Sequence, residues 1–185
     1  MANKLITITG ELGSGKSTVS RKLAALLGAR RYSAGDAQRE IAKARGISTL
    51  ELNLIAENDP SIDKEIDSVF AKLRNSQEAL VVDSRMAWLF LPESVKVKLT
   101  VSPIEAAKRV FGDTQRVSEK AETVEHAFQT LKERRESERR RFQKYYNVDI
   151  EDAAHFDYIV DTTLLSPDQV AESIFGFVTE GGDGK

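Results

Sequence analysis

The residues with the most specific chemistry in this chain form a glycine-rich run near the amino terminus. The run reads Gly10-Glu11-Leu12-Gly13-Ser14-Gly15-Lys16-Ser17, so two glycines enclose four residues, and Lys and Ser follow the second glycine. Glycine lets the backbone turn so that successive N–H groups point at one anion, and a helix that starts there adds the positive end of its dipole. The run therefore predicts a phosphate-binding loop.

The residue types in this loop also predict what it binds. A lysine at this position reaches the β and γ phosphates of a nucleotide, and the hydroxyl that follows is a ligand of Mg²⁺. We expect the loop to bind ATP, with Lys16 as a catalytic residue and Ser17 as a ligand of Mg²⁺. The predicted ATP-binding residues are Gly10, Gly13, Ser14, Gly15, Lys16 and Ser17.

Further along the chain, an acidic residue follows an apolar segment. Residues 79–82 read Ala-Leu-Val-Val and are followed by Asp83. An acid at the end of a buried strand is typical of the Walker B element, whose carboxylate holds Mg²⁺ directly or through water. The alternative is an aspartate that caps a helix. We expect Asp83 to be a second ligand of Mg²⁺.

An arginine-rich segment, residues 132–141, adds a cluster of positive charge. On a helix, Glu138 falls on the same stripe as the apolar side chains of Val124, Phe128, Leu131, Phe142 and Tyr145. Arg134 and Arg141 flank Glu138 at i−4 and i+3, whereas Arg135, Arg139 and Arg140 are predicted to face elsewhere. Charges beside an apolar stripe need partners, and a transferring phosphoryl group is a suitable one. The alternatives are solvated ion pairs and, with Phe142, Tyr145 and Tyr146, nucleic-acid binding.

Composition narrows the class of protein. The chain has 185 residues, is 41% hydrophobic and carries a formal charge of −2, so we expect one domain with no overall attraction to nucleic acid or an anionic membrane. It has no cysteine, and we find no targeting segment or run of about 20 apolar residues. We therefore expect a cytoplasmic protein. A GTPase is disfavoured because an Asn-Lys-x-Asp motif is absent.

The elements that must position these residues alternate along the chain. Strand-like sequence at residues 5–9, 79–82, 95–101 and 158–160 is each time followed by helical sequence, which favours an α/β fold with a parallel sheet. Capping-box patterns at Ser48, Ser102 and Ser166 predict helix starts. Two long helical stretches, 36–73 and 119–146, look like insertions over a nucleotide site. We expect a core of 1–35, 76–112 and 150–180, an acceptor-binding insertion at about 36–75, a lid at about 113–149 and a tail at 181–185.

Taken together, these blocks resemble the cytidylate kinase-like branch of the nucleoside monophosphate kinases. The resemblance covers most of the chain and is carried by residues 10–17, 33–36 with Arg39, 59–67, 83–88, 134–141 and 157–163. It implies a P-loop fold with a five-stranded parallel sheet flanked by helices. It also implies ATP-dependent phosphorylation of a nucleoside monophosphate, CMP or dCMP, with Mg²⁺.

The same resemblance implies roles for further residues. Arg39 and Arg85 would hold the acceptor phosphate, which agrees with the way a planar guanidinium binds phosphate oxygens in pairs. On the lid, Arg134 and Arg141 would contact the phosphates, with Glu138 near the acceptor. The implied catalytic set is Lys16, Arg85, Arg134 and Arg141, and the implied substrate-binding set is Ser33, Asp36, Arg39, Asp83, Arg85 and Glu138.

Two positions depart from the family pattern. Well-known bacterial members have Gly and Asp where this chain has Ser84 and Met86, and that Asp lies near the cytosine. Methionine accepts a hydrogen bond from an amino group poorly. Ser33, Asp36, Asp63 and Asp67 stay open as substitutes for reading the base.

Other readings of the phosphate loop stay open at this stage. One is a kinase of another small phosphorylated metabolite, because one fold hosts many acceptors. Another is a nucleotide-binding sensor that transfers no phosphate. Trp88 is predicted to lie in the apolar core or in the wall of the site, and His126 and His155 are assigned no role. The oligomeric state stays open, and a monomer is compatible with the sequence. We expect both insertions to close over bound substrates and exclude water.

Overall fold

The computed structural model describes residues 5–47, 49–56, 58–113 and 121–180, which form alternating strands and helices. The predicted capping residue Ser48, the start of the predicted lid helix at 119 and the predicted tail at 181–185 lie outside this range. The strands are β1 (Leu5–Gly10), β2 (Arg30–Ser33), β3 (Leu80–Asp83), β4 (Val95–Thr100) and β5 (Tyr158–Asp161). The helices are α1 (Lys16–Leu27), α2 (Ala34–Ala44), α3 (Thr49–Ala56), α4 (Pro60–Arg74), α5 (Ala87–Phe90), α6 (Pro103–Gly112), α7 (Val124–Tyr146) and α8 (Pro167–Thr179), and a short 3₁₀ turn spans Ala153–His155.

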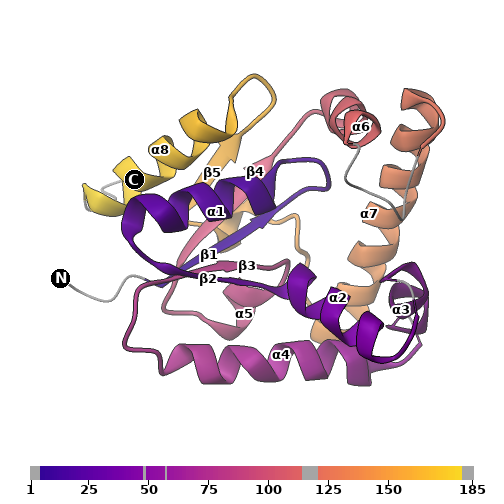
Figure 1. The fold of residues 1–185 in the computed structure, drawn as a ribbon, viewed down its shortest axis with the longest axis horizontal. Coiled ribbons are helices and arrows are strands. Elements are labelled where there is room, and N and C mark those ends of the chain that lie inside the picture. Colours follow the sequence, from indigo (N-terminus) through magenta and orange to yellow (C-terminus); the bar gives the residue numbers. More distant parts are fainter. Residues whose placement is uncertain (1–4, 48, 57, 114–120, 181–185) are drawn as a thin grey trace.

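The sheet confirms the predicted parallel five-stranded arrangement. Its strand order is β2-β3-β1-β4-β5, and each pair of neighbours is parallel. Helices α1 and α8 lie over one face and α4 and α5 over the other (Figure 1). Side chains alternate across β3, so Val81 packs under α1 and α8 while Leu80 and Val82 pack toward α4 and α5. Both faces are therefore buried, which accounts for the apolar strand sequences.

Side-chain caps define where several helices begin. Ser166 and Gln169 form the full predicted capping box at the start of α8. At α6 the box is only half formed: Ser102 accepts a hydrogen bond from the backbone N–H of Glu105, but the Glu105 carboxylate pairs with Arg109 at 3.1 Å. The predicted helix starts at α6 and α8 are therefore confirmed. At α6, Arg109 binds the Glu105 carboxylate that a complete capping box would use.

The predicted helical stretch 36–73 is divided into three helices, α2, α3 and α4. The break after α2 falls at Gly46, which adopts φ +68°, a left-handed conformation that glycine reaches without strain. The start of α4 combines Asp59 as the cap with Pro60 in the first turn, an arrangement that cannot continue a preceding helix. We call these three helices the α2–α4 arm.

The α7 helix runs along the side of the molecule where the strands end (Figure 1). Ala127, near its start, packs with Ala107 and Val110 of α6. Arg134 and its polar neighbours follow further along the helix. Within the described part of the chain, none of the helices combines the length and the apolar composition needed to cross a bilayer.

Candidate active site

The phosphate loop connects β1 to α1 and takes its shape from glycines. Gly13 and Gly15 have φ values of 81° and 80°, and Gly15 is the N-cap of α1. A Cβ atom at Gly10 would lie 2.7 Å from Oγ of Ser14, and one at Gly13 would lie 2.8 Å from Ala106. The loop therefore requires glycine at these positions, both for backbone conformation and for close packing against α6.

One atom of the loop is consistent with a phosphate ligand. Oγ of Ser14 is buried and has no hydrogen-bond partner among the described residues. Buried polar atoms are almost always paired, so an unpaired hydroxyl at a helix amino terminus favours an anion there. The predicted ATP-binding residues therefore lie together where β1 passes into α1: Gly10, Gly13, Ser14, Gly15, Lys16 and Ser17.

Asp83 lies at the end of β3, directly across from the phosphate loop. Its Oδ1 is 2.5 Å from Nζ of Lys16, and its Oδ2 is 2.8 Å from Nη2 of Arg31 and 3.3 Å from Oγ of Ser20. Burial raises the pKa of this carboxyl, but the charge of Lys16 and hydrogen bonds from Lys16, Arg31 and Ser17 outweigh burial and hold the pKa below its ordinary value. The two predicted ligands of Mg²⁺, Ser17 and Asp83, are therefore neighbours.

Burial also affects Lys16. It lowers the pKa of the lysine, while the charge of Asp83 opposes that shift.

Within the described residues, no group of three or more His, Cys, Asp or Glu side chains has the arrangement of a metal site. A Mg²⁺ ion here would consequently depend on phosphate oxygens as well as on Ser17 and Asp83, as is usual for nucleotide-bound magnesium.

Arg31 was missed by the sequence analysis. From β2 it reaches Asp83 on one side and Oδ2 of Asp36 on the other, at 2.9 Å. The Asp36 carboxylate in turn accepts a hydrogen bond from Arg39, and the backbone N–H of Asp36 donates to Oγ of Ser33, the N-cap of α2. The predicted acceptor residues Ser33, Asp36 and Arg39 are therefore together at the start of α2. A signal was available, since Arg31 and Ser33 point to the same face of β2, but the pairing of β2 with β3 is not evident from sequence.

Arg85 is held rigidly by its backbone. Its carbonyl oxygen accepts hydrogen bonds from Oγ1 of Thr9 at 3.1 Å and from Nε1 of Trp88 at 2.9 Å. Its guanidinium donates to the carbonyl oxygen of Gly10, in the phosphate loop, and lies 3.1 Å from the carboxylate of Glu138. Burial lowers the pKa of Arg85, an effect that the charge of Glu138 opposes. This arginine thus connects β3, the phosphate loop and α7.

The two positions that depart from the family pattern are turned into the protein. The side chains of Ser84 and Met86 are buried, and Oγ of Ser84 accepts a hydrogen bond from the backbone N–H of Met86. They stabilise the turn that presents Arg85. The side chains of Asp63 and Asp67, two of the proposed base readers, lie outside the described part of the chain. Trp88 is buried, as predicted, and stacks on His155 with ring centres 4.5 Å apart.

Glu138 is the centre of the charged group on α7. Its carboxylate lies 3.1 Å from Nε of Arg85 and 3.3 Å from Nε of Arg134, and the side chain is only 13% exposed. Burial raises the pKa of Glu138, but the charges of Arg85, Arg134 and Arg141 outweigh burial and hold the pKa below its ordinary value. The predicted trio on α7 therefore comes together with Arg85 in one cluster.

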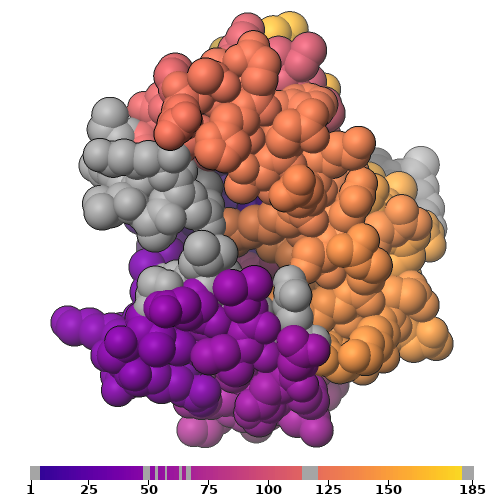
Figure 2. Space-filling view, turned by 90° about the vertical axis from the view of Figure 1, so that its right-hand side faces the viewer, coloured from indigo at the N-terminus to yellow at the C-terminus, as the bar shows by residue number. Residues whose placement is uncertain are grey.

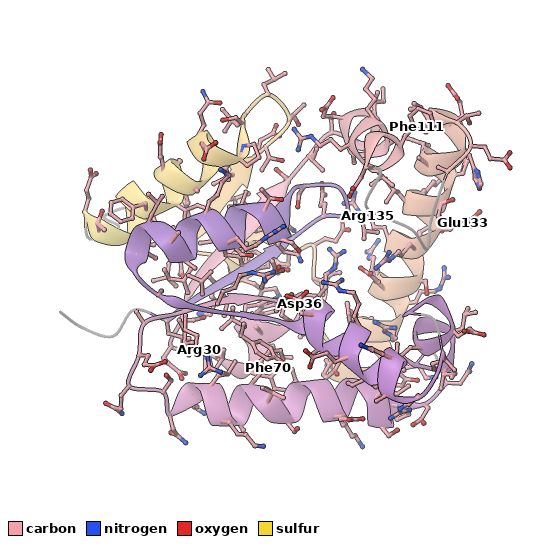
Figure 3. All side chains as sticks on the ribbon, in the orientation of Figure 1. Arg30, Asp36, Phe70, Phe111, Glu133 and Arg135 are labelled. Atoms are coloured by element: carbon pink, nitrogen blue, oxygen red, sulfur yellow. The ribbon has the colours of Figure 1, made fainter. Side chains whose placement is uncertain are left out.

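The prediction that Arg135 faces away from the site is wrong. Arg135 points from α7 toward the phosphate loop (Figure 3), where its Nη2 lies 3.0 Å from the carboxylate of Glu11. It also forms a two-pronged pair with Glu151, with distances of 2.6 and 2.7 Å. The other oxygen of Glu11 accepts the backbone N–H of Val101 at 2.9 Å. Because α7 passes beside the phosphate loop, the side of the helix that carries Arg135 also contacts the loop, in addition to the side that carries Glu138. Arg139 pairs outward with Asp149 at 3.5 Å.

Figure 2 shows a hollow between α7 and the α2–α4 arm, which we call the recess. Beside the phosphate loop lies a pocket, and its walls include Thr9, Gly10, Arg85, Arg135 and Glu138. In open parallel sheets, ligands bind at the carboxyl ends of the strands, so the position agrees with the chemistry of the residues.

The fold and the phosphate loop define the class of protein: the chain has the fold of the P-loop kinases. A solved structure with this fold is the shikimate kinase from Acinetobacter baumannii in complex with shikimate, which is 20% identical with a TM-score of 0.60 and covers 96% of this chain and 93% of that one. At this identity the likeness concerns the fold alone.

Sequence comparison defines the family more narrowly. Residues 5–164 match the cytidylate kinase-like family, and the chain belongs to it. The cytidylate kinase from Natronomonas pharaonis is 39% identical over 167 residues, which cover 90% of this chain and 84% of that protein. The cytidylate kinase from Sulfolobus acidocaldarius is 34% identical, with 94% and 93% covered.

Proposed function

We propose that this protein transfers the γ-phosphoryl group of ATP to a nucleoside monophosphate, with CMP or dCMP as the preferred acceptor. The observation that carries the proposal is membership of the cytidylate kinase-like family over residues 5–164, combined with a phosphate loop in which Lys16 lies 2.5 Å from Asp83. The relatives from Natronomonas and Sulfolobus are named cytidylate kinases.

On the donor side, the phosphate loop binds and orients. Backbone N–H groups at the start of α1 and the Ser14 hydroxyl donate hydrogen bonds to the phosphate oxygens, and Lys16 exchanges Asp83 for the β and γ phosphates. Mg²⁺, held through Ser17 and Asp83, would offset phosphate charge when bound. These residues supply position and charge rather than a covalent intermediate.

On the acceptor side, two arginines hold the monophosphate. Arg39 and Arg85 present planar guanidinium groups that bind phosphate oxygens in pairs. An oxygen of the acceptor phosphate forms the new bond to the γ phosphorus, while the bond from that phosphorus to its bridging oxygen breaks and the electron pair leaves on ADP. No general base is needed, since the acceptor oxygen is already anionic.

Transfer also requires that water is kept from the γ phosphate. Arg134 and Arg141 on α7 add positive charge, and closure of α7 and the α2–α4 arm over the recess would complete the cage and exclude water. The ion pairs of Arg85 and Arg134 with Glu138 hold these groups near one another before substrates bind.

A coupled assay of ADP release tests the proposal. Purified protein with Mg²⁺ and ATP is offered CMP, dCMP, UMP, AMP, GMP and dTMP separately. We expect CMP or dCMP to give a kcat/KM at least about tenfold above the others, because a site that hydrogen-bonds one base leaves buried groups unpaired with another. Binding of ATP without turnover of any acceptor would contradict the proposal and favour a sensor. Shikimate and gluconate, added as acceptors that lack a phosphate, are expected to be inactive.

A further inference from the structure

Arg31 has an unusual set of contacts for a residue outside the motifs. Its Nε donates to Oγ of Ser20 at 2.8 Å, its Nη1 to Asp36 at 2.9 Å and its Nη2 to Asp83 at 2.8 Å. Each nitrogen of the guanidinium thus reaches a different element: α1, α2 and β3. The side chain is 18% exposed. A planar fork with donors at fixed angles suits such a three-way contact, and the single ammonium of lysine does not.

The strand geometry places Arg31, and not Arg30, in this position. Residues of β2 alternate between the two faces of the sheet, and Arg31 is in register with Val81, which lies on the α1 side. Asp83 is two residues further along β3 and therefore points to the same side. Arg30 points to the other face, is exposed and lies away from Asp36 (Figure 3).

Arg31 is the middle member of a chain of alternating charges. The order is Lys16, Asp83, Arg31, Asp36 and Arg39, and each neighbouring pair is in contact. One end is the lysine of the phosphate loop, and the other end is an arginine on the α2–α4 arm. Asp83 and Asp36 each use one oxygen for Arg31 and the other for the cation at the outer end. A change of partner at either end therefore changes how strongly Arg31 is attracted to Asp83 relative to Asp36.

We infer that Arg31 is a positioning residue that couples the donor site to the acceptor site. The inference rests on the proposed function, which makes Lys16 a donor contact and Arg39 an acceptor contact. When phosphates take Lys16 from Asp83, Arg31 becomes the remaining side-chain cation on that carboxylate, and the orientation of Asp36 and Arg39 follows. Binding of either substrate then strengthens binding of the other, and linkage requires the two effects to be equal.

Titration calorimetry tests the coupling without any turnover. The Kd of CMP is measured with and without a non-hydrolysable ATP analogue, in wild type, Arg31→Lys, Arg31→Met and the control Arg30→Met. We expect the analogue to tighten CMP binding at least about fivefold in wild type and Arg30→Met, and less than about twofold in the Arg31 variants. Arg31→Lys keeps the charge and guards against a variant that fails to fold. A wild-type factor near one, or an unchanged factor in Arg31→Lys, would overturn the inference.

Steady-state kinetics separates positioning from a merely structural role. In Arg31→Lys we expect the KM for CMP to rise about tenfold, because both acceptor positioning and coupling are lost, and the KM for ATP to rise only about two- to threefold, because ATP loses the coupling alone. If Arg31 acts on the acceptor through Asp36, the double variant Arg31→Lys/Asp36→Asn is no worse than the more impaired single variant. Independent, additive losses would contradict that route. A wild type without turnover would defeat the proposed function, whereas an active wild type with Arg31→Lys kinetics like those of Arg30→Met would defeat this inference alone.

Discussion

The sheet and the α7 helix both contribute to the site, but different forces hold them in place. All four residues of β3 are buried, and Asp83 is the last of them. The α7 helix spans 23 residues, and among its described side chains only Ala127 and Phe142 are buried. Its active face is held by ion pairs: Glu138 with Arg85, and Arg135 with Glu11 and Glu151.

This difference separates what is fixed from what can move. Apolar burial in a close-packed core tolerates little displacement, so the phosphate loop and Asp83 are in place before substrates bind. Partly exposed ion pairs contribute about 1 kcal/mol or less each, and a phosphate can replace a carboxylate as the partner of an arginine. The core therefore presents the donor site, while α7 and the α2–α4 arm can adjust to the substrates.

The largest loss of activity is expected from replacing Lys16, which lies in the part of the site held by the core. In Lys16→Ala we expect turnover to fall at least about a thousandfold, because a charge that stabilises the transferring phosphoryl group is lost. The far-ultraviolet circular dichroism should stay native, since Lys16 is not part of the apolar core. Lys22→Ala, on the same helix and paired with Asp168 at the surface, is the control and should keep wild-type turnover.

Replacing Arg85 tests the contact between the core and α7. In Arg85→Ala we expect kcat/KM for CMP to fall about a hundredfold, because a guanidinium that binds the acceptor phosphate is lost, while the KM for ATP changes little. Initial rates at varied CMP and varied ATP check this. Arg74→Ala, which removes a surface pair with Glu93, is the control. Equal losses for both substrates would show that Arg85 does not belong to the acceptor side.

Hydrogen exchange compares the two regions in one experiment. A bisubstrate analogue, adenosine and cytidine joined through phosphates, should slow exchange about tenfold or more in α7 and the α2–α4 arm as they close. Amides of β1, β3 and β4 should change little because they are already protected. Unchanged exchange in both α7 and the α2–α4 arm would contradict closure.

The carboxylate of Glu138 gives the smallest expected effect. Its folded-state pKa lies below the ordinary value of 4.5, so its stabilising contribution is present above that value and is lost as the pH falls through the folded pKa. Glu138→Gln should lower the Tm by about 2–4 °C at pH 7, and the difference should shrink below about pH 4. Glu133→Gln, on the exposed side of α7 (Figure 3), is the control. A difference independent of pH would contradict the role of this charge.

The parts of the molecule that were predictable from sequence are those whose information is local. The phosphate loop requires glycine at Gly10, Gly13 and Gly15, and Asp83 is the last residue of β3, so a short segment suffices for each. Arg31 and Arg135 were not predictable, because their partners depend on the register of β2 with β3 and on the path of α7 past Glu11. Met86 was judged by its position in a motif, whereas packing turns its side chain inward.

The most direct test of the proposed reaction follows the phosphoryl group itself. Wild type is incubated with Mg²⁺, CMP and ATP labelled on the γ phosphate, and the products are separated. We predict that the label appears in the β phosphate of CDP, in an amount equal to the ADP formed, and that Lys16→Ala gives no labelled CDP. Label that appears only in inorganic phosphate, or that stays in ATP, would contradict phosphoryl transfer to CMP by this site.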